Sequence, residues 1–215
     1  IPNHYYWDWS KFKITMDRSL FILFLFGILI LNVQAQNFGG GGILGISTSQ
    51  VGGDNLGGFN KAGIIIGVFA NKNISPLLGF QAEMIYIEKG SNNPEMMKDG
   101  IQDITSSYIE IPLLLQYNQS NTLKIEGGIQ TGYLIDAYYN DLNGEMNNEI
   151  NPFIDYDISV LLGMDYKIST NISLNTRISN SIIPIGTEDK NSNTYNSVLK
   201  GKYNSVLSFT LHYNF

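Results

Sequence analysis

The stretch of sequence that decides the fold is residues 207–215, which read L-S-F-T-L-H-Y-N-F. Large apolar side chains occupy every second position, and small or polar side chains occupy the positions between them. Alternate side chains of an extended strand point to opposite faces, so one face of this strand would be apolar and the other polar. The apolar positions are Leu207, Phe209, Leu211, Tyr213 and Phe215. The sequence therefore predicts a strand that separates an apolar environment from a polar one.

The same alternation recurs in stretches of ten or more residues, and no helical periodicity of useful length follows residue 35. A tilted strand needs about 9–11 residues to cross a membrane, so each stretch is long enough to do so. We expect strands, with ends uncertain by a few residues, at 38–49, 61–71, 77–89, 107–117, 122–138, 153–167, 172–185 and 202–215. The number of strands is even, as in single-chain bacterial barrels.

The connections between these strands alternate between short and long. The short ones are polar and lie at 71–75, 118–121 and 168–171, whereas the long ones, rich in Asn, Gly and Asp, lie at 50–60, 90–106, 140–152 and 186–201. Outer-membrane barrels have short periplasmic turns and longer outer loops. We therefore predict an all-β fold, a single eight-stranded antiparallel up-and-down transmembrane β-barrel. A soluble barrel or sandwich is the alternative, because alternation alone does not say which face meets water.

An apolar run at residues 20–33 follows Arg18 and ends at Val33-Gln34-Ala35, a pattern typical of a secretory signal peptide. The run is shorter than the roughly 20 residues of a spanning helix, although a helical anchor is the alternative. The predicted division of the chain is an upstream extension at 1–15, a cleavable signal peptide at 16–35 and an outer-membrane barrel at 36–215. The chain contains no cysteine, which excludes a lipoprotein anchor and disulfide bonds.

Three segments resemble a known family. They are G-F-Q-A-E-M-I-Y at 79–86, Y-I-E-I-P-L-L-L at 108–115 and the closing residues 205–215, and they are similar to the outer-membrane β-barrel domain of Bacteroidetes, the porin-family or PorT-like group. The resemblance implies a fold and a location in the outer membrane, and it implies no activity. Pro112 within the second segment lacks a backbone N–H, so we expect a β-bulge or a locally unpaired position there.

The polar faces of the predicted strands carry charged residues into the barrel interior. An eight-stranded barrel is just wide enough for side chains to fill it, and an unpaired charge there is unfavourable. We therefore expect a hydrogen-bonded plug in which Lys124 and Arg177 pair with the acidic groups, and we place Asp136 on the same interior face. The predicted network consists of Glu83, Glu110, Lys124, Glu126, Asp157, Asp165 and Arg177. The alternative is an ion-conducting path or a small-ligand pocket.

Catalytic and cofactor signals are weak. His212 alternates with the apolar residues of the last strand, so we expect it in the lumen, away from the lipid rim where a lipid-modifying enzyme needs its catalytic group. Gly40, Gly42 and Gly45 match G-x-G-x-x-G, but no helix pattern follows, and dinucleotide binding is rejected. We predict no catalytic residue, no cofactor and no metal site.

The leading functional hypothesis is a non-enzymatic outer-membrane protein, with a plugged barrel as the anchor and four extracellular loops for interaction or envelope integrity. A narrow channel for small solutes and an envelope lipid enzyme are the alternatives. The net charge of −6 argues against nucleic acid as a partner. Expected partners are outer-membrane lipid, a protein bound by the outer loops, and the barrel-assembly machinery. The signal for assembly is predicted to be Phe209, Leu211, Tyr213 and Phe215.

Overall fold

The structure is a computed structural model that describes residues 38–52, 58–92, 103–141, 144–145, 153–186 and 201–215. The predicted upstream extension and signal peptide, and part of each predicted long loop, lie outside the described residues. Among the residues that are described, no helix has the length and hydropathy needed to cross a bilayer.

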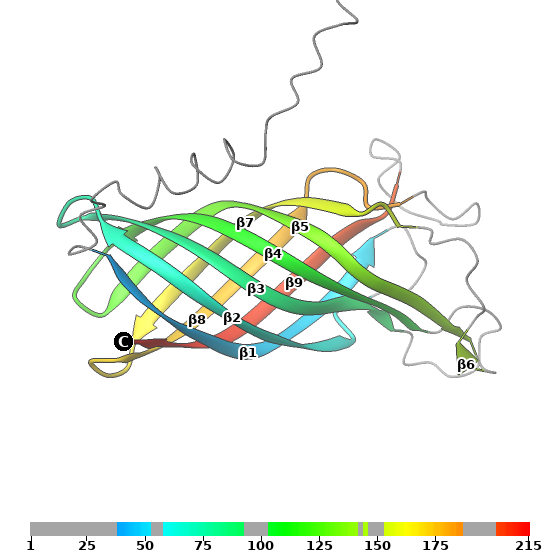
Figure 1. The fold of residues 1–215 in the computed structure, drawn as a ribbon, viewed down its shortest axis with the longest axis horizontal. Helices are drawn as coiled ribbons and strands as arrows, with labels where there is room; N and C mark the ends of the chain where they lie inside the picture. Colours follow the sequence, from blue (N-terminus) through cyan, green and yellow to red (C-terminus); the bar gives the residue numbers. More distant parts are fainter. Residues whose placement is uncertain (1–37, 53–57, 93–102, 142–143, 146–152, 187–200) are drawn as a thin grey trace, which may run out of the picture. The chain divides into compact units, whose positions relative to one another are not determined.

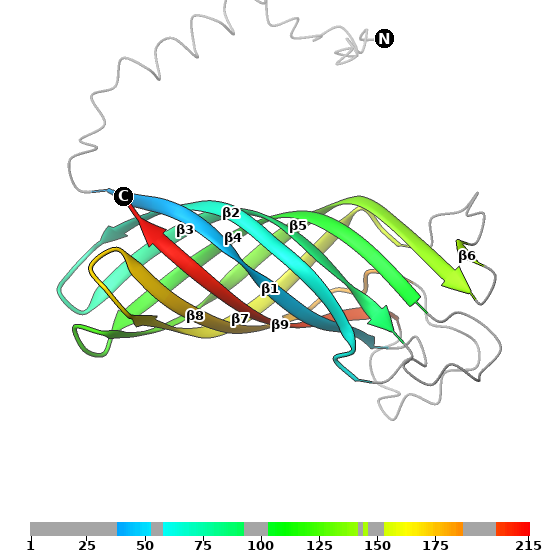
Figure 2. The ribbon, with the colours of Figure 1, turned by 90° about the horizontal axis from the view of Figure 1, so that it is seen from below.

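Within the described residues, nine antiparallel strands form one closed sheet (Figures 1 and 2). They are β1 (Gly39–Gly52), β2 (Lys61–Asn73), β3 (Leu78–Asn92), β4 (Asp103–Asn118), β5 (Leu123–Asp141), β6 (Gly144–Glu145), β7 (Tyr156–Lys167), β8 (Ile172–Ser181) and β9 (Tyr203–Asn214). The order is β4-β3-β2-β1-β9-β8-β7-β5, and the pairing of β4 with β5 closes the ring. The two-residue strand β6 pairs with the end of β5. The eight long strands confirm the predicted up-and-down barrel.

The largest errors in the predicted strand ends fall at the long-loop end of the barrel. The strand expected from residue 107 begins at Asp103, because Asn92 and Asp103 still pair across β3 and β4. The strand expected to reach residue 185 ends at Ser181. Beyond it, isolated bridges join Gly186 to Phe153 and to Lys202, in place of a continuous ladder.

Three short turns lie at one end of the barrel, together with the C-terminus and the start of β1 (Figure 1). A serine organises each turn, because its Oγ accepts the N–H of the residue three positions ahead, at 3.0–3.2 Å, and its own N–H donates to that residue's carbonyl. The pairs are Ser75 with Leu78, Ser120 with Leu123 and Ser169 with Ile172. This side-chain bond stabilises a tight reversal of the chain.

The outer face of the barrel is apolar on every wall strand. Large exposed side chains are Ile46, Val68, Met84, Leu115, Ile129, Leu162, Ile178 and Leu211, one from each of the eight strands. Phe209, Tyr213 and Phe215 also point outward, and the ring centroids of Tyr213 and Phe215 are 5.9 Å apart. A soluble protein rarely exposes so large an apolar surface. The burial pattern therefore selects the membrane barrel over the soluble alternative.

Pro112 is accommodated by a local break in the ladder rather than by a bulge. Ala82 pairs with Leu113 and Ile85 pairs with Glu110 in the same register, and the positions between them are unpaired. Of the two expected accommodations, the structure therefore confirms the locally unpaired position.

The irregularity of β4 lies nearer its start, between Ser107 and Tyr108, where the register with β5 shifts. Ser107 pairs with Asp136 and Tyr108 pairs with Leu134, so Ile135 is an extra residue in β5. The extra residue reverses the alternation of β5 beyond it. Asp136 is therefore exposed, and its predicted interior position was wrong.

Candidate functional site: the barrel lumen

Among the described residues, two ion-pair clusters in the barrel interior are each built from one cation and two carboxylates. In the first, the Arg177 cluster, the guanidinium of Arg177 from β8 binds Glu83 from β3 through both Nη atoms, at 2.7 Å each. Its Nε donates to Oε1 of Glu126 from β5. The three side chains are at most 9% exposed. Such a bidentate pair of hydrogen bonds fixes both the distance and the orientation of the guanidinium and the carboxylate.

Amide side chains satisfy the remaining oxygens of the Arg177 cluster. Gln116 Nε2 donates to Glu126 Oε2 at 3.1 Å, and Asn175 Nδ2 donates to Glu126 Oε1 at 2.8 Å. Gln81 Nε2 donates to Glu83, and Gln81 in turn accepts a bond from Gln116. Buried carboxylates need these partners, because each unfilled lone pair loses the hydrogen bond that water would supply.

The second group, the Lys89 cluster, joins Lys89 of β3 to Glu110 of β4 and Asp157 of β7. The ammonium contacts Glu110 Oε1 and lies 3.1 Å from Asp157 Oδ2, and all three side chains are about 1% exposed. The ammonium also lies 4.8 Å from the centre of the Tyr108 ring, a favourable cation–π distance. Asp157 additionally accepts hydrogen bonds from Ser159, Ser181 and Asn204, at 2.9, 2.7 and 2.9 Å.

Glycines make room for both clusters in the lumen. Gly163 lies in register between Glu126 and Arg177, and Gly132 lies in register between Glu110 and Asp157. A Cβ at Gly163 would lie 2.6 Å from Arg177 Cγ, and one at Gly132 would lie 3.3 Å from Glu110 Cγ. Since only glycine leaves this space, the charged side chains can cross over the intervening strand.

An apolar belt separates the two clusters. It consists of Ile43, Ile65, Ile85, Leu161 and Val206, all buried in the lumen. These side chains border a void of about 20 Å³ whose other walls include Glu83 and Arg177 of one cluster and Glu110 of the other. The void has room for about one water molecule. The void is also bordered by Gln130, Ser179, Ser208 and Thr210, so the clusters are divided by packed apolar and polar side chains with room for little water.

Apolar side chains also fill the lumen at the long-loop end. Val51, Ile104, Phe153 and Ile185 are at most 5% exposed and belong to one buried cluster. Ile185 and Lys202 are linked by a backbone hydrogen bond of 2.8 Å, and the Lys202 ammonium lies 5.8 Å from the Phe153 ring centre. This packing covers the Lys89 cluster on the loop side.

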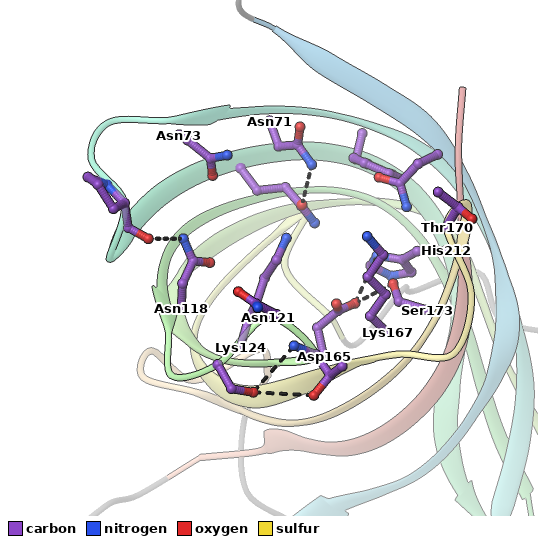
Figure 3. Close-up of a pocket in the computed structure, with 16 residues that line it drawn as sticks. Asn71, Asn73, Asn118, Asn121, Lys124, Asp165, Lys167, Thr170, Ser173 and His212 are labelled. Carbon is purple, nitrogen blue, oxygen red and sulfur yellow. Dashed lines mark hydrogen bonds and ion pairs between the residues drawn. The ribbon is translucent and has the colours of Figure 1, made fainter.

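The structure distributes the predicted network differently from the sequence expectation. Glu83, Glu126 and Arg177 meet in one cluster, and Glu110 and Asp157 meet in the other. Lys124 and Asp165 join neither. Both lie at the turn-side mouth of the lumen (Figure 3).

Lys124 was expected to be a cation of the buried network, and this expectation was wrong. It lies near the start of β5, two residues before Glu126, where the lumen opens, and within the described residues it forms no ion pair. The cation of the second cluster is Lys89, which was not predicted because it stood at the predicted end of its strand. The alternation of Gln81, Glu83, Ile85 and Ile87 already placed Lys89 on the inner face.

His212 lies in the lumen, as predicted, with 2% of its surface exposed. Its ring is stacked on Phe69 at 5.3 Å, its Nε2 is 3.1 Å from Thr210 Oγ1, and its Nδ1 is 3.9 Å from Asp165 Oδ2. These contacts hold the imidazole inside the wall and away from the lipid-facing surface. Among the described residues, no three His, Cys, Asp or Glu side chains are grouped to hold a metal ion.

The chain was compared with protein families, curated proteins and solved structures. The family model described as "Outer membrane protein beta-barrel domain" matches residues 27–186. The chain is similar in structure to Ail, the attachment invasion locus protein of Yersinia pestis, solved in complex with the heparin analogue sucrose octasulfate, with 11% identity, a TM-score of 0.48, and coverage of 83% of this chain and 99% of Ail. Neisserial surface protein A is 17% identical with a TM-score of 0.49, and the match covers 83% of this chain and 97% of that protein. OprG from Pseudomonas aeruginosa is 15% identical with a TM-score of 0.38, and the match covers 83% of this chain and 94% of OprG. No curated protein matches the chain.

Removing the guanidinium should destabilise the barrel strongly. We predict that Arg177→Met lowers the free energy of unfolding by about 3–5 kcal/mol, because Glu83 and Glu126 would stay buried without a cation. Urea unfolding in lipid vesicles measures this change. The control is Lys72→Met, which removes a lysine that contacts only the Phe38 ring among described partners, at 4.9 Å, and should change stability by about 1 kcal/mol or less. Equal effects of the two substitutions would contradict the role of the Arg177 cluster.

The glycine beside Arg177 provides an independent test. Gly163→Ala should lower the free energy of unfolding by about 1–3 kcal/mol, because the new methyl group meets both Arg177 Cγ and Thr176 O, the latter at 2.7 Å. Gly42→Ala is the matched control, since a Cβ there has no neighbour within 4 Å. Unfolding midpoints measured under the same conditions should separate the two variants. An unchanged midpoint for Gly163→Ala would argue against close packing of the Arg177 side chain over Gly163.

Proposed function

The chain belongs to the outer membrane protein β-barrel domain family, and on this premise we propose that it is a non-enzymatic, non-conducting anchor. Its plugged barrel would hold four outer loops at the cell surface, for interaction or for envelope integrity. The observation that carries the proposal is the packed lumen, in which the apolar belt and the two ion-pair clusters leave a void of only about 20 Å³ between them.

Charge pairing in the lumen supports an anchor over a channel. A conducting path needs a lumen that water and ions can enter, whereas Arg177 and Lys89 are buried and each held by two carboxylates. A narrow channel is the second candidate, favoured by a polar cavity of about 370 Å³ at the turn-side mouth. Conduction would require the Arg177 cluster and the apolar belt to separate.

Further parts of the proposal rest on the sequence. The outward-facing Phe209, Leu211, Tyr213 and Phe215 would be read by the barrel-assembly machinery, and residues 16–35 would be a cleavable signal peptide. The Tyr-x-Glu-Ile-Pro-Leu-Leu segment at 108–114 supports the narrower assignment to the PorT-like group of Bacteroidetes. An outer-loop partner would be a protein, met chiefly by the predicted loop at 90–106.

Single-channel recording tests the plug. We predict that the purified protein, inserted in a planar bilayer, gives no reproducible current steps, because hydrocarbon and paired charges block the lumen. The heat-dependent gel shift of a folded barrel verifies insertion, so that an absence of current is not confused with failure to insert. Stable current steps of constant size from the inserted protein would contradict the anchor function and favour the channel function.

Deleting residues 94–101 tests the separation between barrel and loop. We predict that the deletion leaves the barrel folded, because β3 and β4 pair as far as Asn92 and Asp103, and Lys61 Nζ binds Asp103 at 2.8 Å beside them. The gel shift and the unfolding midpoint measure this outcome. Asp103→Asn is the companion variant, which removes the ion pair and keeps the loop. Loss of assembly on deletion would show that the loop is part of the barrel's folding unit.

A further inference from the structure

A polar cavity of about 370 Å³ opens at the turn-side end of the lumen (Figure 3). Its walls come from strands β2, β3, β4, β5, β7, β8 and β9 and from the three short turns between them. Gln81 lines the cavity and also donates to Glu83 of the Arg177 cluster. The cavity is therefore a blind cup whose inner end adjoins the buried ion pairs.

Amide groups dominate the wall of this cup. Five asparagines face it, namely Asn71, Asn73, Asn118, Asn121 and Asn214. They come from two strands at one side, from β9 at another and from the turn between β4 and β5, and four of them are labelled around the opening in Figure 3. An amide both donates and accepts hydrogen bonds, so a ring of amides matches a ligand with several hydroxyl groups, each of which also does both. The amide nitrogens of Asn71, Asn118 and Asn214 each already donate one hydrogen bond to a protein oxygen, so a ligand would meet mainly their oxygens and the amides of Asn73 and Asn121.

The charges in the cup favour an anion. Lys124 and Lys167 line it, and neither forms an ion pair within the described residues. The carboxylate in the wall, Asp165, accepts a hydrogen bond from Ser173 at 2.7 Å and lies 3.9 Å from His212 Nδ1. Two lysines without a carboxylate partner thus face the cavity of a protein whose net charge is −6. An ammonium attracts a carboxylate or phosphate as a point charge.

Phe69 and His212 add an aromatic contact to the wall. Their rings are stacked with centroids 5.3 Å apart, and both residues line the cavity, where 6% of Phe69 and 2% of His212 is exposed. Aromatic side chains offer a flat apolar surface beside polar groups, a combination that suits a ligand ring with apolar C–H faces and polar edges. The volume is at the small end of the range for ligand pockets, about 300–1,000 Å³.

We propose that this turn-side cup binds a small polyhydroxylated carboxylate, such as an acidic monosaccharide. The asparagines would bind the hydroxyl groups, Lys124 and Lys167 would bind the carboxylate, and the Phe69–His212 pair would contact the sugar ring. The site is independent of the proposed anchor function, because it lies on the opposite side of the Arg177 cluster from the apolar belt.

Calorimetric titration of the purified protein in detergent micelles tests the site with three probes. D-Glucuronate carries both hydroxyls and a carboxylate, D-glucose lacks the charge, and acetate lacks the hydroxyls. We expect saturable binding of glucuronate that is about tenfold tighter than that of glucose or acetate, since a charge-assisted hydrogen bond contributes on this scale. Equal binding of acetate would reduce the cup to a simple anion site and overturn the proposal, as would the absence of saturable binding.

Variants of the two lysines assign the binding to the cup. Lys124→Gln and Lys167→Gln should each weaken glucuronate binding by about tenfold and leave glucose binding unchanged. The matched control is Lys72→Gln, a lysine at the same end of the barrel that is absent from the cavity wall and contacts the Phe38 ring. Equal weakening by Lys72→Gln would indicate a general charge effect and contradict the site.

A variant in a turn keeps the proposal testable if the lysine variants fail to fold. Asn121 lies in an exposed turn outside the strands, so Asn121→Asp should leave the gel shift of the folded barrel intact. The added negative charge should weaken glucuronate binding and spare glucose binding. An unchanged glucuronate affinity in this folded variant would place the ligand elsewhere and overturn the proposal.

Discussion

The energetic cost of placing charge inside a narrow barrel is the constraint on which the rest of this structure depends. The lipid-facing surface requires an apolar outer register, so the charged side chains of Glu83, Glu126 and Arg177 in the wall strands are directed inward. Eight strands leave too little room for bulk water in the lumen, and a charge there must find a protein partner. Arg177 meets this requirement with Glu83 and Glu126, and Lys89 meets it with Glu110 and Asp157.

These pairings connect strands that are far apart in the sequence. Arg177 and Glu83 are 94 residues apart, and Lys89 and Asp157 are 68 apart. A slip of one residue in any of these strands would turn a charged group toward lipid and an apolar group toward the lumen. A buried ion pair adds little net stability compared with apolar packing, but its loss is strongly unfavourable. We therefore infer that the clusters chiefly select the register of the barrel, and that Gly132 and Gly163 permit this by leaving space beside the charged chains.

The sequence predicts the wall of this barrel better than its contents. Alternation is a local property, so the strands, their inward and outward faces and the positions of His212 and Phe209 follow from it. Pairing across the lumen depends on the height of each side chain along the barrel, which in turn depends on strand tilt and register. For this reason Lys124, two residues from Glu126, was assigned to the wrong depth, and Lys89 was missed. The extra residue Ile135 in β5, which exposes Asp136, also lacks a signal in the alternation. The serines of the three short turns do carry such a signal, a Ser followed three positions later by Leu or Ile.

The two ends of the lumen differ, and the difference bears on function. At the long-loop end, apolar side chains such as Phe153 and Ile185 cover the Lys89 cluster, whereas the turn-side end is open and lined by amides and lysines. A simple plug would need neither the opening nor two lysines that form no ion pair within the described part of the chain, because apolar residues could fill that end equally well. A pore would need the opening but not the apolar belt between the clusters. The arrangement is that of a closed barrel with a separate cup on one side. The anchor and the cup can therefore be altered independently, because the Arg177 cluster and the belt lie between the cup and the loop-bearing end.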